Sequence, residues 1–284
     1  MASWAERYER GEHEVVWDEL VALGPEVFEP TWRADAEEVA ARTMRRAAAN
    51  LSVLAVRLTS LGFRSGYNYD RNKRRQTILD LGLRDSMEAA GRDVSWVDAG
   101  ELSEHVLGWE EPGPEVDKEL ATAERLVGPL PLSLVALYRA IDAVSLSGSF
   151  PDWDPATYHF EEDPDHPFGI LADPLNFYGI GMINENFPPG SDFLRPDAEK
   201  AERSFAMPIA PNALLSANRR GNYHHIHVPD PVADPEIEGV FNRPGIRLVP
   251  YLRAAFEWGG FPGYAFAPSV PPQIAVLREG LLPI

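Results

Sequence analysis

The spacing of apolar residues changes near residue 143 of this 284-residue chain, and this change constrains the fold more than any other feature of the sequence. Before it, apolar residues recur every three or four positions, which predicts helices at residues 12–23, 35–61, 114–127 and 131–141. After it, short apolar stretches separated by Pro, Gly, Asn and Asp predict strands at residues 144–146, 168–171, 177–183, 205–209 and 223–228. Two more helices are expected at residues 248–258 and 272–282. Strands that follow a run of helices favour an α+β fold over a doubly wound sheet.

A short segment rich in Glu, Pro and Gly, residues 110–114, indicates a boundary between two parts of the chain. We therefore expect an N-terminal helical extension at residues 1–112 and an α+β domain at residues 113–284. Within the extension, Asp35 and Glu38 have the spacing of a capping box, so the long helix is expected to begin at Asp35.

The absence of cysteine excludes disulfides, Cys-ligated metal sites and thiol catalysis. The chain also has no run of about 18 apolar residues that would cross a membrane, and its first residues lack the apolar core of a secretory signal. From these features we expect a cytoplasmic protein.

The charge of the chain is strongly unbalanced. Asp and Glu number 44 and Lys and Arg number 26, which gives a formal net charge of −18. Residues 140–199 alone hold 12 acids and one base, Arg195. Such a surface repels phosphate backbones and anionic lipids and attracts basic proteins, so we expect no direct contact with nucleic acid or membrane. Simple solubility is the other explanation of the charge.

The most acidic segment contains the candidate partner-binding residues. An aromatic side chain within an acidic rim is typical of a protein-binding surface, and Trp153 lies among these acids. The alternative is that Trp153 packs into the core beside Pro151 and Pro155. The candidate residues are Asp152, Trp153, Asp154, Glu161, Glu162, Asp163 and Asp165.

One cluster of residues could hold a metal ion. In the predicted strand at 223–228, His225 and His227 lie on one face, because side chains alternate along a strand, and His224 lies on the other. Two imidazoles at this spacing can share zinc or nickel. A third ligand could come from the acidic segment, where His159, His166, Asp163 and Asp165 are available. The alternative is an edge strand whose exposed face carries histidine without a metal.

Motifs of common enzymes are absent from the sequence. It contains no phosphate-binding GxxxxGK[ST] loop, no GxSxG nucleophile elbow and no HExxH zinc motif. Gly179 and Gly181 lack the third glycine of a dinucleotide-binding fingerprint. We therefore expect no cofactor and no catalytic residues, with the two histidines left open as the metal alternative.

Several segments of residues 115–284 together resemble the SUKH superfamily. The first is ERLVGPLPLS at residues 124–133, followed by LYRA at 137–140, which is similar to the family's helix, "LG-x-LP" turn and second helix. Other similar segments are residues 173–175, 216–230, 251–263 and 279–284. The family's usual glycines at the start of the sheet are replaced here by Asp142-Ala143-Val144-Ser145.

The resemblance implies a mostly antiparallel sheet packed by helices, and a role without catalysis. The superfamily includes immunity proteins that bind and block toxin domains, often nucleases, and also the yeast Smi/Knr cell-wall assembly regulator and the bacterial Syd protein. The resemblance thus implies an immunity protein that neutralises a toxin, and the acidic charge of the chain suits a basic toxin. A regulatory scaffold for a housekeeping partner, and a metal-dependent hydrolase using His225 and His227, are the alternatives.

Overall fold

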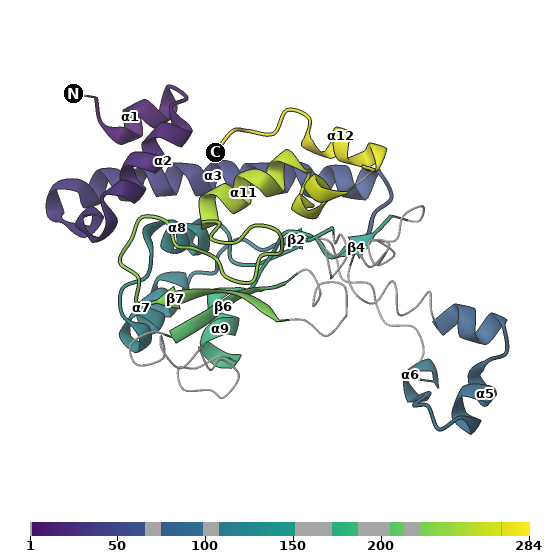
Figure 1. The fold of residues 1–284 in the computed structure, drawn as a ribbon. Coiled ribbons are helices and arrows are strands. Elements are labelled where there is room, and N and C mark those ends of the chain that lie inside the picture. The colour runs from purple at the N-terminus through teal and green to yellow at the C-terminus, as the bar shows by residue number, and fades with distance from the viewer. Residues whose placement is uncertain are drawn as a thin grey trace.

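The structure is a computed structural model that describes residues 2–65, 75–98, 108–150, 172–186, 205–212, 222–267 and 269–284. Within these residues it has an α+β fold with an N-terminal helical part, as the sequence predicts. The helices pack above and beside small sheets, and the N-terminal helices lie next to the C-terminal helices (Figure 1).

The N-terminal part is built around one long helix. Helices α1 (Trp4–Glu9) and α2 (His13–Ala22) and a 3₁₀ turn, η1 (Gly24–Phe28), lead into α3 (Pro30–Ser60). The predicted helix at 35–61 is confirmed, and residues spaced three or four apart form its buried face: Val39, Thr43, Ala47, Leu51, Leu54 and Leu58.

The beginning of α3 differs from the prediction. The helix starts at Pro30, whose fixed φ and missing N–H suit the first turn of a helix. Asp35 therefore lies inside the helix and does not cap it. Its carboxylate accepts hydrogen bonds from the backbone N–H groups of Trp4 (2.7 Å) and Ala5 (3.0 Å), so it holds the start of α1 instead.

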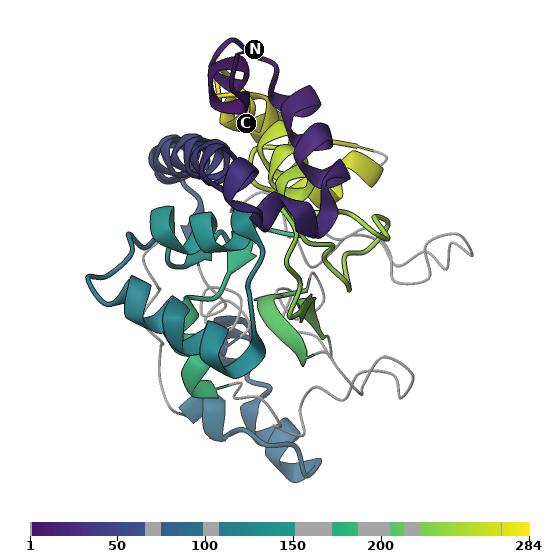
Figure 2. The ribbon, with the colours of Figure 1, turned by 90° about the vertical axis from the view of Figure 1, so that its left-hand side faces the viewer.

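Helices α7 (Val116–Val127) and α8 (Leu132–Ala140) form the predicted helical hairpin, and α8 packs against α3. Figure 2 shows this pair beneath the coil of α3. The turn between them contains Gly128, at φ +86°, where an added Cβ would come within 2.8 Å of Pro229. The turn between the two helices is thus packed directly against the residue that follows the last long strand.

The strands form small antiparallel sheets within the described residues. β1 (Arg64–Ser65) pairs with β4 (Gly148–Ser149). In a second sheet β3 (Val144–Ser145) pairs with both β2 (Gly108–Trp109) and β5 (Asn176–Phe177). The longest strands, β6 (Phe205–Pro211) and β7 (Tyr223–Val228), pair with each other through a register shift between Pro208 and Ala210.

The strand predicted at residues 177–183 is wrong. The chain leaves β5 after Phe177 and forms helix α9 (Ile180–Asn186), in which Ile180 and Ile183 are buried at helical spacing. Asn184 donates a hydrogen bond to the Glu119 backbone carbonyl at 3.1 Å, which fixes α9 against α7. A short apolar run fits either a buried strand or a buried helix, and here packing against α7 selects the helix.

The C-terminal segment returns to α3. It contains α11 (Leu248–Glu257), the 3₁₀ turn η2 (Pro262–Phe266) and α12 (Pro272–Arg278). Asn50 of α3 makes two hydrogen bonds to the backbone of Leu282, donating to its carbonyl (2.9 Å) and accepting from its N–H (2.7 Å). Arg57 donates to the Leu277 carbonyl at 2.8 Å. The polar residues of α3 therefore hold the end of the C-terminal segment in place.

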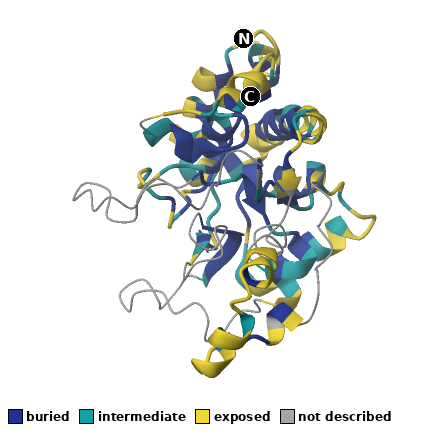
Figure 3. Ribbon diagram, turned by 90° about the vertical axis from the view of Figure 1, so that its right-hand side faces the viewer, coloured by how far each residue is buried: buried dark blue, intermediate teal, exposed yellow. Residues whose placement is uncertain are grey.

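One continuous apolar core joins residues from α1 through to Ile284. It includes residues on both sides of the predicted boundary at residue 112, such as Leu51 of α3 and Leu134 of α8. The division into an extension and a domain stays a prediction. Figure 3 shows the buried residues gathered between the long helix and the sheets, and Figure 1 shows the short helices α5 (Arg84–Ala89) and α6 (Ser95–Asp98) away from that centre.

Among the described residues, none of the helices combines the length and apolar character that a membrane span requires.

Candidate functional site

Residues 151–171 lie outside the described residues, and all the predicted partner-binding residues fall among them. The same holds for the four residues that were considered as a third metal ligand. The residues concerned are Asp152, Trp153, Asp154, His159, Glu161, Glu162, Asp163, Asp165 and His166. Their role in partner binding stays a prediction.

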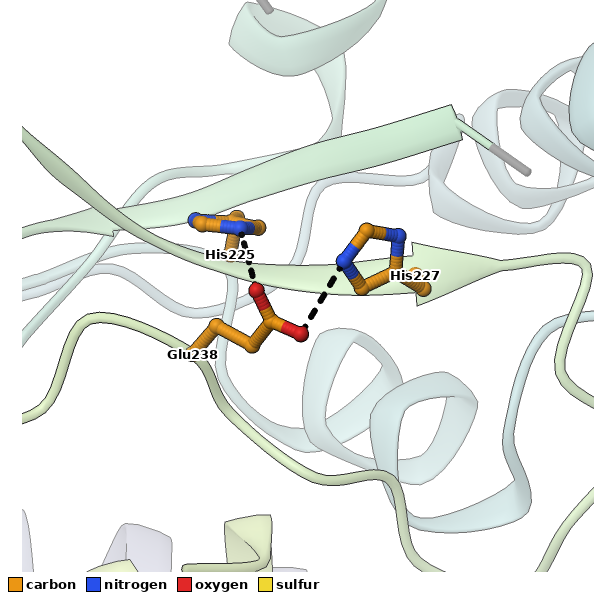
Figure 4. Close-up of side chains that lie close together, drawn as sticks. All are labelled: His225, His227 and Glu238. Carbon is orange, nitrogen blue, oxygen red and sulfur yellow. Dashed lines mark hydrogen bonds and ion pairs between the residues drawn. The ribbon is translucent and has the colours of Figure 1, made fainter. Parts of the chain in front are cut away.

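Strand β7 places its histidines as the alternation predicts. His224, Ile226 and Val228 are buried on the inner face, whereas His225 and His227 are partly exposed on the outer face. The side chains of His225 and His227 are 18% and 24% exposed, so solvent reaches both. Figure 4 shows both imidazoles on the same side of the strand.

The structure brings one further residue to these histidines, Glu238. One carboxylate oxygen lies 3.2 Å from His225 Nε2 and the other lies 3.1 Å from His227 Nε2 (Figure 4). The carboxylate thus lies between the two rings, whose centroids are 5.6 Å apart. Among the described residues these three side chains form a group with ligand atoms within 4.8 Å of one another.

Glu238 reaches this position through the backbone. The His225 N–H donates to the Glu238 carbonyl at 3.2 Å, and the Glu238 N–H donates to the His225 carbonyl at 2.8 Å. Glu238 therefore pairs with β7 on the side that β6 leaves open. Ile237 between the two glutamates is buried, which points both carboxylates outward.

The sequence did not indicate Glu238, because ten residues without a regular pattern separate it from His227. The available signal was short: Glu236-Ile237-Glu238 alternates polar and apolar side chains and ends at Gly239. Such a three-residue alternation predicts at most an isolated bridge. It does not indicate which strand the segment will join.

A buried acid anchors the loop between β7 and Glu238. Asp234 accepts hydrogen bonds from the Ser133 hydroxyl (2.7 Å) and from the Val249 N–H (3.1 Å) at the start of α11. Burial raises the pKa of Asp234 to about 7, although these two donors favour the charged form. The contacts tie this loop to α8 and α11 and so fix the base of the segment that carries Glu238.

A second buried polar group lies behind the inner face of β7. Tyr251 of α11 donates a hydrogen bond to Asp173 at 3.4 Å, and its ring packs edge-on against His224 at 5.7 Å between centroids. Burial raises the pKa of Asp173 to about 7 and lowers the pKa of His224 to about 3. Both groups are therefore held near or in their neutral forms within the core.

A groove of about 850 Å³ separates the start of α2 from the segment after α12. Its lining mixes acids such as Glu14 and Glu279 with bases such as Arg253 and Arg278. Arg253 is itself engaged, because it donates to the carbonyls of Ile284 (2.6 Å) and His13 (3.2 Å). Arg253 thus joins the start of α2 to the last described residue of the chain.

Comparison with known proteins identified no relative: no family model matches the chain, and no curated protein and no solved structure matches it. The resemblance to the SUKH superfamily accordingly stays a prediction from the sequence.

Proposed function

We propose that this protein is a non-enzymatic binding module of the SUKH type whose partner is a basic protein. In the most specific form of the proposal, it is an immunity protein and the partner is a bacterial toxin domain, such as a nuclease. The observation that carries the proposal is the charge of residues 140–199, which hold 12 acids and a single base.

The charge of this segment contrasts with that of the N-terminal helices. There, acids and bases pair locally: Arg7 lies 2.6 Å from Glu19, and Arg42 lies 2.7 Å from Glu38. Residues 1–100 contain 17 acids and 14 bases, so most of their charge can be balanced in this way. Residues 140–199 contain too few bases for such pairing, and a basic partner would supply them.

An excess of one charge sign speeds the encounter with a partner of opposite sign, and salt screens this attraction over about 8 Å at physiological ionic strength. We therefore expect the association rate with the partner to fall steeply with salt. The dissociation rate should change much less, because contacts formed in the complex are partly shielded from solvent.

Affinity capture with a matched pair of variants tests the proposal. The wild-type protein is immobilised, lysate of its own organism is applied at low salt, and bound proteins are eluted by a salt step. The test variant replaces the six acids of the candidate surface by Asn or Gln: Asp152, Asp154, Glu161, Glu162, Asp163 and Asp165. The control variant neutralises six exposed acids outside residues 140–199: Glu14, Asp18, Glu26, Glu29, Glu110 and Glu111.

We expect a basic protein that the wild type and the control retain and that the test variant loses. A partner retained equally by all three proteins would remove the acidic segment as the binding surface. If no basic protein is retained by the wild type from cells that carry its neighbouring genes, the proposal fails.

The identity of the captured protein separates an immunity protein from a regulatory scaffold. If the partner is a toxin, expression of the partner alone should arrest growth. Co-expression of the partner with this protein should restore growth. A housekeeping protein whose expression is harmless would favour the scaffold instead. The metal-dependent hydrolase remains the alternative that depends on metal binding by the outer face of β7.

A further inference from the structure

We propose that His225, His227 and Glu238 form a binding site for a divalent transition-metal ion, with Zn²⁺ as the best match. This inference goes beyond the proposed binding function and does not rest on it. Two imidazoles and one carboxylate are ligands that zinc commonly takes in proteins, and three protein ligands leave one position for water.

The distances among the three side chains suit a zinc ion. Zinc lies about 2.0–2.2 Å from nitrogen and oxygen ligands, so two ligands of a tetrahedral site are about 3.3 Å apart. The contacts of Glu238 with His225 Nε2 (3.2 Å) and His227 Nε2 (3.1 Å) already match that separation. All three ligand atoms lie within 4.8 Å, so small side-chain rotations bring the two imidazoles to the same spacing.

The second nitrogen of His225 supports this geometry. His225 Nδ1 lies 3.3 Å from the Tyr223 carbonyl oxygen, which can accept a hydrogen bond but cannot donate one. A hydrogen on Nδ1 makes Nε2, the nitrogen on the Glu238 side of the ring, the one that coordinates an ion. A backbone carbonyl on the far ring nitrogen is also the usual way in which proteins orient a metal-bound histidine.

The backbone holds the ligands in place before any ion arrives. His225 and Glu238 are joined by two backbone hydrogen bonds, and Ile237 donates to the Ile246 carbonyl at 2.8 Å on the other side. Gly239 follows at φ +85°, and a Cβ there would come within 2.9 Å of the Tyr223 carbonyl oxygen. This close approach keeps the segment that carries Glu238 tight against β7.

Solvent reaches the site, so an ion can enter and water can complete its coordination. The Glu238 side chain is 44% exposed, and the two histidines are exposed to a smaller degree. Binding would join β7 to the segment at 236–238. It would therefore stabilise the folded protein in proportion to the logarithm of the free metal concentration.

Metal titration of the purified full chain, after removal of metal with a chelator, tests the site. We expect one Zn²⁺ per chain by competition with a chromophoric chelator. One Co²⁺ should give the intense visible absorption of a tetrahedral site with nitrogen and oxygen ligands. His225→Ala, His227→Ala and Glu238→Gln should each weaken Zn²⁺ affinity by at least about tenfold, since even the groups behind the ligands contribute about that much.

Two controls distinguish this site from others. Glu236→Gln changes the neighbouring exposed acid of the same segment, which lies 3.6 Å from Arg247, and should leave Zn²⁺ affinity within about twofold of wild type. The double variant His159→Ala/His166→Ala should also leave Zn²⁺ affinity within about twofold of wild type. The inference is overturned if wild type binds less than one Zn²⁺ at tens of micromolar free metal. It is equally overturned if Glu238→Gln binds Zn²⁺ as wild type does. A thermal melt of each variant without metal verifies that it is folded.

Discussion

The two faces of strand β7 differ in what determines them. The inner face, with His224, Ile226 and Val228, belongs to the core and follows from the alternation of side chains along one strand. The outer face becomes a site only when Glu238 arrives from a segment 13 residues away from His225. One face is thus set by local pattern and the other by a tertiary contact.

The largest expected effect comes from a substitution on the inner face of β7. Ile226 is fully buried in the core, so Ile226→Ala should lower the free energy of unfolding by about 2–5 kcal/mol through lost burial and a residual cavity. His227→Ala, one residue along on the outer face, is the matched control. Urea denaturation in the presence of a chelator measures both. Equal losses for the two variants would contradict the difference between the faces.

The next effect concerns Asp173, behind the inner face. Its pKa is raised from 3.8 to about 7, so between these pH values the folded protein keeps a proton that the unfolded chain has lost. The contribution of this group to the free energy of unfolding therefore falls as pH rises from about 4 to about 7, by at most about 1.4 kcal/mol per pH unit. Asp173→Asn removes this dependence.

Stability of Asp173→Asn relative to wild type should thus rise across that pH range and stay level above it. Asn also tolerates the left-handed backbone at this position, where φ is 50°. Denaturation measured at several pH values provides the comparison, with the exposed Asp18→Asn as control. Parallel pH profiles for wild type and Asp173→Asn would show that the carboxyl is ionised normally in the core.

A smaller effect tests how the outer face is assembled. Gly239→Ala combines a positive φ with a contact of 2.9 Å to the Tyr223 carbonyl oxygen, whereas Gly245→Ala has a similar φ (+72°) and no atom within 4 Å. Both changes should cost about 1–2 kcal/mol for the backbone conformation. Gly239→Ala should cost more and should also weaken Zn²⁺ binding, because it displaces Glu238. Identical Zn²⁺ affinities for the two variants would contradict this.

The smallest effect is expected from His227→Ala in the absence of metal. The side chain is 24% exposed and faces away from the core, and its contact with Glu238 is partly open to solvent, so its loss should change stability by no more than about 1 kcal/mol. In saturating Zn²⁺, wild type should gain thermal stability and His227→Ala should not. A gain of equal size in both proteins would place the metal elsewhere.

The sequence predicted the parts of the structure that depend on local periodicity. The long helix and strand β7 were found because Leu51, Leu54 and Leu58, and then His224, Ile226 and Val228, repeat at the spacing of their elements. Helix α9 was missed, since its short apolar run fits both a strand and a helix and only the contact with α7 decides.

The sequence predicted only part of the candidate site. The two histidines lie on one face as expected, but the third ligand was sought in the acidic segment. Glu238 joins the two histidines through a bridge of two backbone hydrogen bonds that no pattern within residues 236–239 specifies. The acidic segment lies outside the described residues, so its role in binding depends on the capture experiment.

The hydrogen bonds of Asn50 have a consequence for the time course of folding. Asn50 and Leu282 are separated by 232 residues, and the contact between them closes a very long loop. Contacts of this kind form slowly compared with local ones, such as the packing of α1 against α3. During synthesis, α3 is complete long before Leu282 exists. The apolar face of α3 is therefore partly exposed while the rest of the chain is being synthesised. At this stage a chain is most prone to aggregate or to bind a chaperone.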